Sequence, residues 1–320
     1  MRDPEWRWLE AAAQHPGISR RDFLRWTGAA GGAAMLAGCP PMEEGCPEGR
    51  PAGDQFEETN ICIIGSGFGG AVAAARLTEA GLPVTLVERG TRWDILGLPD
   101  APFTSGFDPD ERSSWLSERS NLPLVPDFFN RDIEKYVGVL ELIEEDGINI
   151  YAGAGYGGRS LVYGALFLQS RPDVFSQIFP SEITYAEFDQ IYYPRARARL
   201  NATPIPDDLL GERYWRYGRV FRDQATKAGL DVIRVPTGTN WDVIRGEIAG
   251  TVPPSAIEGE LIVGNNSGSK TSLDTNYLRD AELTGLLSVR LLTEVQDIEQ
   301  LQDGRYRVFC NTINVNGCVI

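Results

Sequence analysis

Residues 61–70 read ICIIGSGFGG, and residues 84–88 read VTLVE. The first stretch is an apolar, β-branched run that ends in a Gly-x-Gly-x-x-Gly turn, and the small residues at 71–77 predict a helix directly after it. The second stretch predicts another strand, and it ends in an acid. Strand, glycine turn, helix, strand and acid together form the sequence pattern of an adenine dinucleotide site.

Each part of this pattern has a physical role. Gly65 permits the tight turn, Gly67 lets the backbone approach a pyrophosphate, and Gly70 lets the helix pack close to the strand. The helix N-terminus offers free N–H groups to phosphates, and Glu88 would accept hydrogen bonds from the adenosine ribose. The motif alone does not separate FAD from NAD, and a glycine turn without a ligand is the alternative. The candidate cofactor-binding residues of the turn are Gly65, Ser66, Gly67, Phe68, Gly69 and Gly70.

The first 57 residues indicate export rather than a fold. Residues 19–25, SRRDFLR, have the twin-arginine pattern, and the weakly apolar stretch 27–38 is too short to span a bilayer. The sequence LAGC at 36–39 resembles a lipobox, which predicts lipidation of Cys39 and a signal peptide over 1–39; an ordinary signal with a chance cysteine is the alternative. Residues 40–57, rich in Pro, Gly and Glu, read as a flexible tether.

Composition limits the function classes. The chain has 320 residues, 42% of them hydrophobic, which is enough for one large or two modest cores. Its net charge of −15 argues against nucleic acid as a partner. Helices are also predicted over 185–200 and over 207–228, the second ending at Gly229.

Cysteine and histidine usage adds further predictions. Cys62 falls in the first strand and is predicted to be a buried small hydrophobe, and no spacing suggests a metal site. Cys310 and Cys318 flank a hairpin-like loop; a disulfide between them and two free thiols are both open. The only histidine is His15, inside the signal region, so a histidine base is missing from the mature chain and no catalytic residue is assigned.

A second glycine-dense stretch follows a predicted strand. Residues 147–169 read GINIYAGAGYGGRSLVYGALFLQ. Glycine at this density is typical of a backbone that lies flat against a ligand. A mobile surface loop is the alternative, and the aromatic and aliphatic neighbours disfavour it because mobile loops are usually polar.

These blocks together carry a family resemblance. From about residue 58 onward the chain resembles the glucose–methanol–choline (GMC) oxidoreductases, most closely the bacterial cholesterol oxidases with non-covalent FAD. The blocks occur in the family's order, and they are GSGFGG at 65–70, NRDIEKYVGVL at 130–140, the loop at 155–166, IFP at 178–180, YPRA at 193–196 and GNNSG at 264–268.

The resemblance implies an α/β fold with an FAD-binding, Rossmann-like domain of the GMC type and an α+β substrate-binding domain. The implied FAD-binding domain comprises 58–92 and 270–320, and the substrate-binding domain comprises 93–269. Family members continue well beyond the position that corresponds to Ile320, and their catalytic residues lie in that part. Both domains are therefore expected to be incomplete, and the chain is expected to be truncated at its C-terminus.

The resemblance also implies roles for individual residues. The 65–70 turn would hold the FAD pyrophosphate and Glu88 its ribose, while Val295 would pair its backbone with the adenine. The implied residues along the flavin are Gly157, Gly158, Ser160, Tyr163 and Leu166. The chain departs from the family at Arg159, where Gly is usual, and at Tyr163, where an Asn normally contacts the flavin.

The function implied by the resemblance is FAD-dependent oxidation of a CH–OH group. In sterol members a 3β-hydroxysteroid becomes a 3-ketosteroid by hydride transfer to the flavin, and O₂ or another acceptor reoxidises it. A lipid anchor would hold the enzyme on the bacterial cell envelope near an apolar alcohol. The alternatives are a non-sterol alcohol, an inactive lipid-anchored remnant with at most nucleotide binding, and an NAD dehydrogenase.

Overall fold

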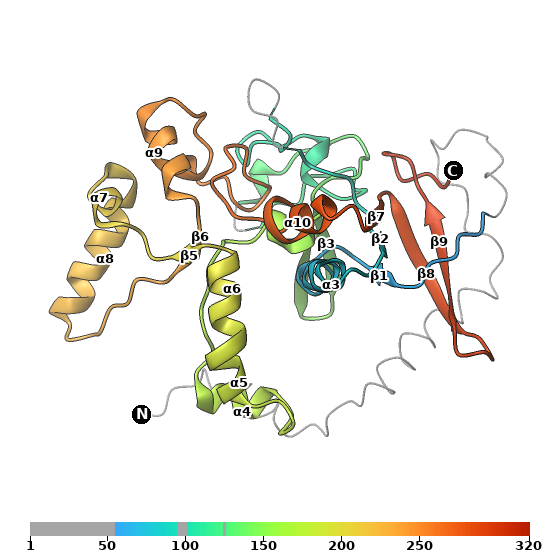
Figure 1. The fold of residues 1–320 in the computed structure, drawn as a ribbon. Helices are drawn as coiled ribbons and strands as arrows, with labels where there is room; N and C mark the ends of the chain where they lie inside the picture. The colour runs from blue at the N-terminus through green and yellow to red at the C-terminus, as the bar shows by residue number, and fades with distance from the viewer. Residues whose placement is uncertain (1–54, 95–100, 124–125) are drawn as a thin grey trace. The chain divides into compact units, whose positions relative to one another are not determined.

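A three-stranded parallel sheet organises the part of the chain that carries the first glycine turn. The structure is a computed structural model, and it describes residues 55–94, 101–123 and 126–320. Strands β1 (Cys62–Ile64), β2 (Val84–Val87) and β7 (Leu287–Arg290) pair in the order β1-β2-β7 (Figure 1). Ile63 stands opposite Leu86, and Leu86 stands opposite Val289. The predicted α/β class with a parallel sheet is confirmed.

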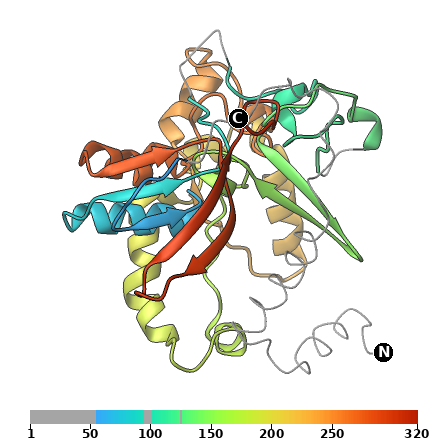
Figure 2. The ribbon, with the colours of Figure 1, turned by 90° about the vertical axis from the view of Figure 1, so that its right-hand side faces the viewer.

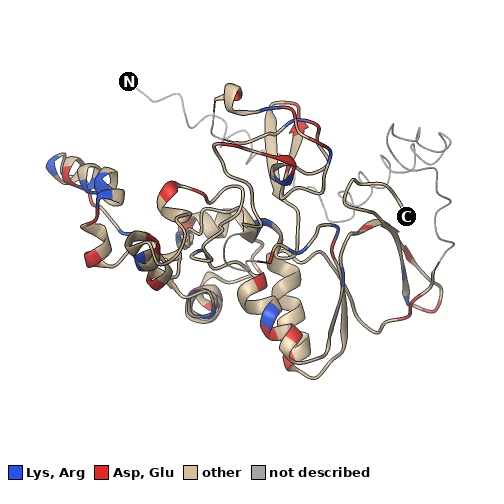
Figure 3. Ribbon diagram, turned by 90° about the horizontal axis from the view of Figure 1, so that it is seen from above, with Lys and Arg blue, Asp and Glu red and all other residues tan. Residues whose placement is uncertain are grey.

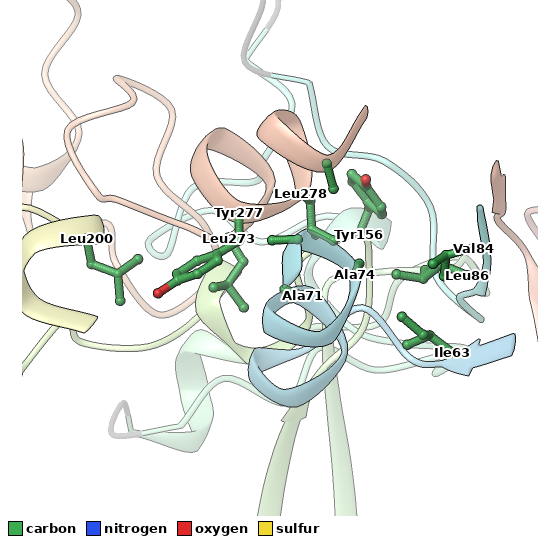
Figure 4. Packing of buried hydrophobic residues seen from close by; sticks show 12 residues of the cluster. Ile63, Ala71, Ala74, Val84, Leu86, Tyr156, Leu200, Leu273, Tyr277 and Leu278 are labelled. Carbon is green, nitrogen blue, oxygen red and sulfur yellow. The ribbon is translucent and has the colours of Figure 1, made fainter. Parts of the chain in front are cut away.

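Helix α3 (Phe68–Glu79) connects β1 to β2 and packs its small residues inward. Ala71, Ala74 and Ala75 are buried, which brings the helix axis close to the sheet. Figure 4 shows Ala71 and Ala74 between the strands and a second helical segment. That segment consists of the π-helical turn η8 (Asp274–Leu278) and α10 (Arg279–Leu283), which supply Leu273 (just before η8), Tyr277, Leu278 and Ala281 to the same core.

Two antiparallel hairpins extend from the sheet region (Figure 2). Strand β3 (Leu140–Glu145) pairs with β4 (Ile148–Gly153), and β4 leads directly into the second glycine-dense loop, as predicted. Strand β8 (Thr293–Gln300) pairs with β9 (Tyr306–Thr312), with a register shift between Val295 and Asp297. In the middle of the chain, the short strands β5 (Ala202–Thr203) and β6 (Thr237–Gly238) pair with each other in antiparallel orientation.

The helix predicted over 185–200 is confirmed with one irregularity. It is formed by α5 (Tyr185–Glu187), the π-helical turn η5 (Phe188–Tyr192) and α6 (Tyr193–Arg199) in direct succession. The aromatic rings of Phe175, Phe179 and Phe188 pack against each other at its start, which ties it to α4 (Pro172–Ile178).

The single helix predicted over 207–228 is wrong, because the segment is interrupted. It consists of α7 (Asp207–Leu210), the 3₁₀ turn η6 (Arg213–Trp215) and α8 (Arg216–Lys227). Glu212 has an extended backbone with ψ of 157°, and the Arg219 guanidinium donates at 2.6 Å to both the Leu210 and the Glu212 carbonyl. A side chain thus takes the carbonyls that a continuous helix would use.

The remaining elements are η2 (Glu111–Ser113), η3 (Asp127–Phe129), η4 (Gly158–Leu161), α9 (Trp241–Ala249) and η7 (Ala256–Glu258).

One cysteine prediction is corrected, and one question that the sequence left open is answered. Cys62 is exposed rather than buried, because Ile63 faces the core while Cys62 and Ile64 point to the opposite face of β1. Cys310 is a free thiol and Cys318 is disulfide-bonded, so the two do not form a disulfide with each other. The tight turn closes between Ile313 and Val319, and Cys310 instead lies on β9 opposite Val295, so the two cysteines are not cross-strand partners.

Charged residues of both signs occur on several of the described helices, namely α3, α8, α9 and α10 (Figure 3). Among the described elements, none is a helix with the length and apolar character needed to cross a bilayer. The predicted signal peptide, Cys39 and most of the tether lie outside the described residues.

Candidate functional site

The first glycine turn leaves open space above its backbone. Gly65 has a φ of +82°, which turns the chain sharply from β1 into α3. A Cβ built at Gly65, Gly67 or Gly69 would meet nothing within 4 Å. Gly67 is the N-cap of α3 and has no side chain to cap it, so the positive end of the helix dipole faces this space. An anionic group such as a pyrophosphate fits this cradle.

Gly70 confirms the packing role predicted for it. A Cβ there would stand 1.9 Å from the Gly65 carbonyl oxygen, which is less than any real contact. The helix therefore starts against the turn itself, and only glycine permits this approach.

The second glycine loop lies directly against the first. A Cβ at Gly158 would stand 2.7 Å from the Cα of Gly67, and Gly158 has a φ of +55°. The Gly157 N–H donates to the Ser66 hydroxyl at 2.9 Å. The structure thus brings together two candidate segments that are 91 residues apart in sequence.

Glu88 sits beneath the turn and already has backbone partners. Its Oε2 accepts from the Ser66 N–H at 2.9 Å and lies 2.5 Å from the Ser66 Oγ, and its Oε1 accepts from the Gly90 N–H at 2.9 Å. The side chain is 6% exposed. Its first role is therefore to hold the turn in shape, although a carboxylate has further lone pairs for a ribose hydroxyl.

Ser160 and Tyr163 connect the second loop to residues far along the chain. The buried Ser160 hydroxyl donates to the Gly157 carbonyl at 2.7 Å and accepts from the Leu273 N–H at 2.9 Å. The Tyr163 hydroxyl donates to the Thr271 carbonyl at 2.7 Å. Burial raises the pKa of Tyr163, so its hydroxyl stays protonated as a donor.

The two departures from the family pattern have different surroundings. Arg159 is exposed, and its guanidinium donates to the Tyr151 carbonyl on β4, so the side chain leaves the loop on the outer side. The Tyr163 ring instead lies edge-on to Phe68 of the first turn, with centroids 5.7 Å apart. The Tyr163 departure therefore contacts the candidate site, whereas the Arg159 departure does not.

Leu166 and Val295 lie at the margins of this arrangement. Leu166 is 59% exposed and forms an isolated antiparallel bridge with Thr237. Val295 lies on β8, two residues beyond Thr293, whose N–H donates to the Glu88 carbonyl at 3.0 Å. The β8 strand thus begins beside the end of β2 where Glu88 lies.

Sequence reasoning missed several residues that support the loop. Tyr156 is fully buried, and the Arg92 guanidinium lies 4.2 Å from its ring centroid while bonding to Glu282. Lys270 and Asp274 are also mostly buried beside the loop. Asp274 follows the GNNSG block by six residues along the chain, and nothing in its spacing indicated that it would lie next to Gly157.

Comparisons with known proteins agree with this geometry. Residues 17–37 match the model of the twin-arginine translocation pathway signal sequence, and residues 63–93 match that of the NAD(P)-binding Rossmann-like domain. A cholesterol oxidase of Acinetobacter baumannii is 64% identical over 254 residues, which is 75% of this chain and 41% of that protein. A cholesterol oxidase of Mycobacterium tuberculosis is 26% identical over 273 residues, which is 78% of this chain and 41% of that protein.

The chain belongs to the GMC oxidoreductase family. Membership of this family implies a flavin cofactor, and the signal sequence implies export by the twin-arginine route. This GMC chain spans 41% of the length of the curated relatives that it matches. The solved structure of a fungal aryl-alcohol oxidase is also similar to this chain, with 14% sequence identity and a TM-score of 0.46. The match covers 81% of this chain and 43% of the oxidase chain.

Proposed function

We propose that this chain forms the cofactor-binding part of an exported, FAD-dependent oxidoreductase that acts on alcohol CH–OH groups. The observation that carries the proposal is the contact of the two glycine segments at Gly67 and Gly158. A nicotinamide dinucleotide needs only the first turn, with its helix N-terminus and acid. A second backbone segment held flat against that turn provides a surface for a larger planar ring system.

The residues divide into three roles in this proposal. The 65–70 turn and the N-terminus of α3 bind the pyrophosphate, and Glu88 and Val295 lie on the adenosine side. Gly157, Gly158 and Ser160 provide backbone along the flavin, with Tyr163 and Leu166 at the end of the loop. A bound flavin supplies a hydride acceptor for alcohol oxidation. The described residues contribute orientation and exclusion of water, and we assign no catalytic residue among them.

The same proposal divides the chain into two domains. Residues 58–92 and 270–320 form the FAD-binding domain, which is supported by the pairing of β1 and β2 with β7 in one sheet. Residues 93–269 form the substrate-binding domain. The glycine loop belongs to the second domain by sequence but touches the first, which places the cofactor at their junction.

The proposed substrate is an apolar secondary alcohol of the sterol class, with O₂ or another acceptor taking the electrons. Its support is that the two curated relatives above are both cholesterol oxidases. Tyr163 next to Phe68 is the position at which a different alcohol would be selected, because this ring alters the surface that faces the cradle.

We also propose that Cys39 carries lipid and holds the protein on the cell envelope. The lipobox-like sequence at 36–39 supports this. Expression of the full chain and of Cys39→Ser in a bacterium with twin-arginine export tests it. The native chain should partition into the detergent phase and the variant into the aqueous phase; aqueous partition of both would contradict lipidation.

The cofactor is tested by the visible spectrum of the full chain after purification and desalting. We expect flavin absorption bands that are lost on denaturation, and release of FAD identified by mass. Gly67→Val tests the position of the cofactor. A Cβ at this position meets nothing within 4 Å, but the side chain occupies the space that the cradle offers to the pyrophosphate. Gly218→Val, also in open space but on the exposed helix α8, is the matched control.

A specific observation favours a second candidate, because the matching domain model is described as NAD(P)-binding. A colourless protein whose fluorescence shows saturable binding of a reduced nicotinamide dinucleotide would support that candidate. It would also overturn the flavin proposal.

A further inference from the structure

Lys270 is an unusual basic residue in this chain. The sequence contains 30 basic residues, and the only three lysines among them are Lys135, Lys227 and Lys270. Lys270 is 4% exposed, whereas Arg76, Arg119 and Arg290 form ion pairs on the described surface. A buried lysine in a chain that mostly uses arginine marks a position that accommodates a compact amine donor.

The Lys270 side chain ends among peptide carbonyls. Its Nζ donates to the Leu161 carbonyl at 2.5 Å and to the Leu261 carbonyl at 2.6 Å, and the Tyr163 carbonyl lies 3.4 Å away. Leu161 and Tyr163 both belong to the second glycine-dense loop. An ammonium has three N–H groups and a neutral amine has two, so the two short contacts are satisfied in either protonation state.

Lys270 is part of a longer seam between two segments. The Tyr163 hydroxyl bonds to the carbonyl of Thr271, and the Leu273 N–H bonds to the Ser160 hydroxyl. Hydrogen bonds at Lys270, Thr271 and Leu273 therefore join residues 160–163 to residues 270–273. Within the seam, Lys270 is the residue whose side chain bonds to the carbonyls of Leu161 and Tyr163.

The charged and titratable neighbours of Lys270 are few. Asp274, on η8, attracts its charge, and the Tyr163 ring lies 5.8 Å from Nζ. Lys270 and Asp274 line one small cavity together with Phe103 and Asn265. The Asp274 Oδ1 in this region is buried with no hydrogen-bond partner and lies near Gly157. Burial lowers the pKa of Lys270 to about 7 and raises the pKa of Asp274.

We propose that Lys270 is a positioning residue of the candidate cofactor site: its bonds to the Leu161, Tyr163 and Leu261 carbonyls hold the 157–163 loop against the 65–70 turn. Through Gly158, which touches Gly67, any displacement of the loop alters the surface that faces the cradle. Lys270 touches neither the turn nor the cradle itself, so it acts through the loop. The effect on the loop is independent of the proposed function, whereas the effect on cofactor binding rests on it.

Hydrogen exchange of the cofactor-free full chain tests the loop directly. Lys270→Met keeps the length of the side chain but removes its donors, and Lys227→Met on the exposed end of α8 is the matched control. We expect the Val162 and Leu273 amides to exchange at least tenfold faster in Lys270→Met, with Thr85 in the sheet unchanged. Exchange of Val162 and Leu273 equal to that in Lys227→Met would overturn the proposal.

A measurement on the native chain covers the case in which Lys270→Met fails to fold. Labelling with ¹⁵N-lysine gives three Nζ signals. The Lys270 Nζ protons should exchange with water at least tenfold more slowly than those of Lys227, because they are buried and hydrogen-bonded. Equal exchange rates would contradict the bonds on which the proposal rests.

Flavin affinity then separates this inference from the proposed function. If the native chain binds FAD, Lys270→Met should raise the dissociation constant about tenfold or more and Lys227→Met should not. An unchanged dissociation constant would overturn the positioning role. If the native chain binds no flavin, the proposed function fails, and the exchange experiments alone decide the role of Lys270.

Discussion

Gly158 stands over Gly67 at a distance that leaves no room for a side chain. A Cβ at position 158 would be 2.7 Å from the Gly67 Cα, and the Gly158 backbone has a φ of +55°. Both facts require glycine at position 158. The contact joins a turn after the first strand to a loop after the fourth, and it defines the candidate cofactor site.

Gly158→Ala should therefore reduce both stability and cofactor binding. The left-handed backbone costs a non-glycine residue about 1–2 kcal/mol, and the clash with Gly67 adds to this. Urea unfolding followed by tryptophan fluorescence measures the loss. Gly164→Ala is the control, because a Cβ there meets nothing within 4 Å. Equal stability of the two variants would show that the loop does not contact the turn.

Ser66→Ala should destabilise the fold by about 1–3 kcal/mol. The buried hydroxyl lies 2.5 Å from the Glu88 Oε2 and accepts from the Gly157 N–H, which would lose its partner. Ser176→Ala is the control, since the exposed Ser176 hydroxyl bonds only to Pro172 within its own helix. Denaturant unfolding compares the two, and a loss no larger than that of Ser176→Ala would refute the bridging role.

Tyr163→Phe should cost about 1 kcal/mol and leave a flavin spectrum unchanged. The hydroxyl donates to the Thr271 carbonyl, so its loss removes a structural bond while the ring keeps its place beside Phe68. Tyr217→Phe, at an exposed ring, is the control. A shifted flavin spectrum in Tyr163→Phe would mean that the hydroxyl contacts the cofactor instead.

Lys270 should make stability depend on pH in a defined window. Its pKa falls from 10.5 to about 7 on burial, so the unfolded chain binds more protons than the folded chain between these values. The free energy of unfolding should therefore rise with pH across this window, by at most about 1.4 kcal/mol per pH unit, and this gain is lost progressively as the pH falls from 10.5 to about 7. The difference between the native chain and Lys270→Met, measured by urea unfolding at several pH values, isolates this contribution. A difference that is constant between pH 7 and 10.5 would contradict it.

Local sequence predicted the elements whose signals are short-range. The β-branched run at 61–64, the glycines at 65–70 and the alanines that follow specify a strand, a turn and a helix through backbone and packing preferences of neighbouring residues. The helix over 207–228 is predicted as one element that ends at Gly229. The break arises from Arg219, whose guanidinium binds the carbonyls at 210 and 212, and spacing alone does not show which acceptor a long side chain reaches.

The pairing of Cys310 with Cys318 is a question that the sequence leaves open for a similar reason. Cys310 and Cys318 are close in sequence, and this made a pair between them plausible. Pairing requires facing positions on neighbouring strands, and the register of β9 places Cys310 opposite Val295. Register depends on contacts with β8, which lies outside the local segment.

The sequence by itself determined the α/β unit and the glycine turn between its first strand and helix, because these depend on residues that are neighbours along the chain. Only the tertiary structure decided that the second loop rests on the first, that Glu88 holds Ser66 and Gly90, and that Lys270 reaches the Leu161 carbonyl. These contacts join residues as far as 109 positions apart. Their geometry follows from how the packed elements place the backbone, which no local preference encodes.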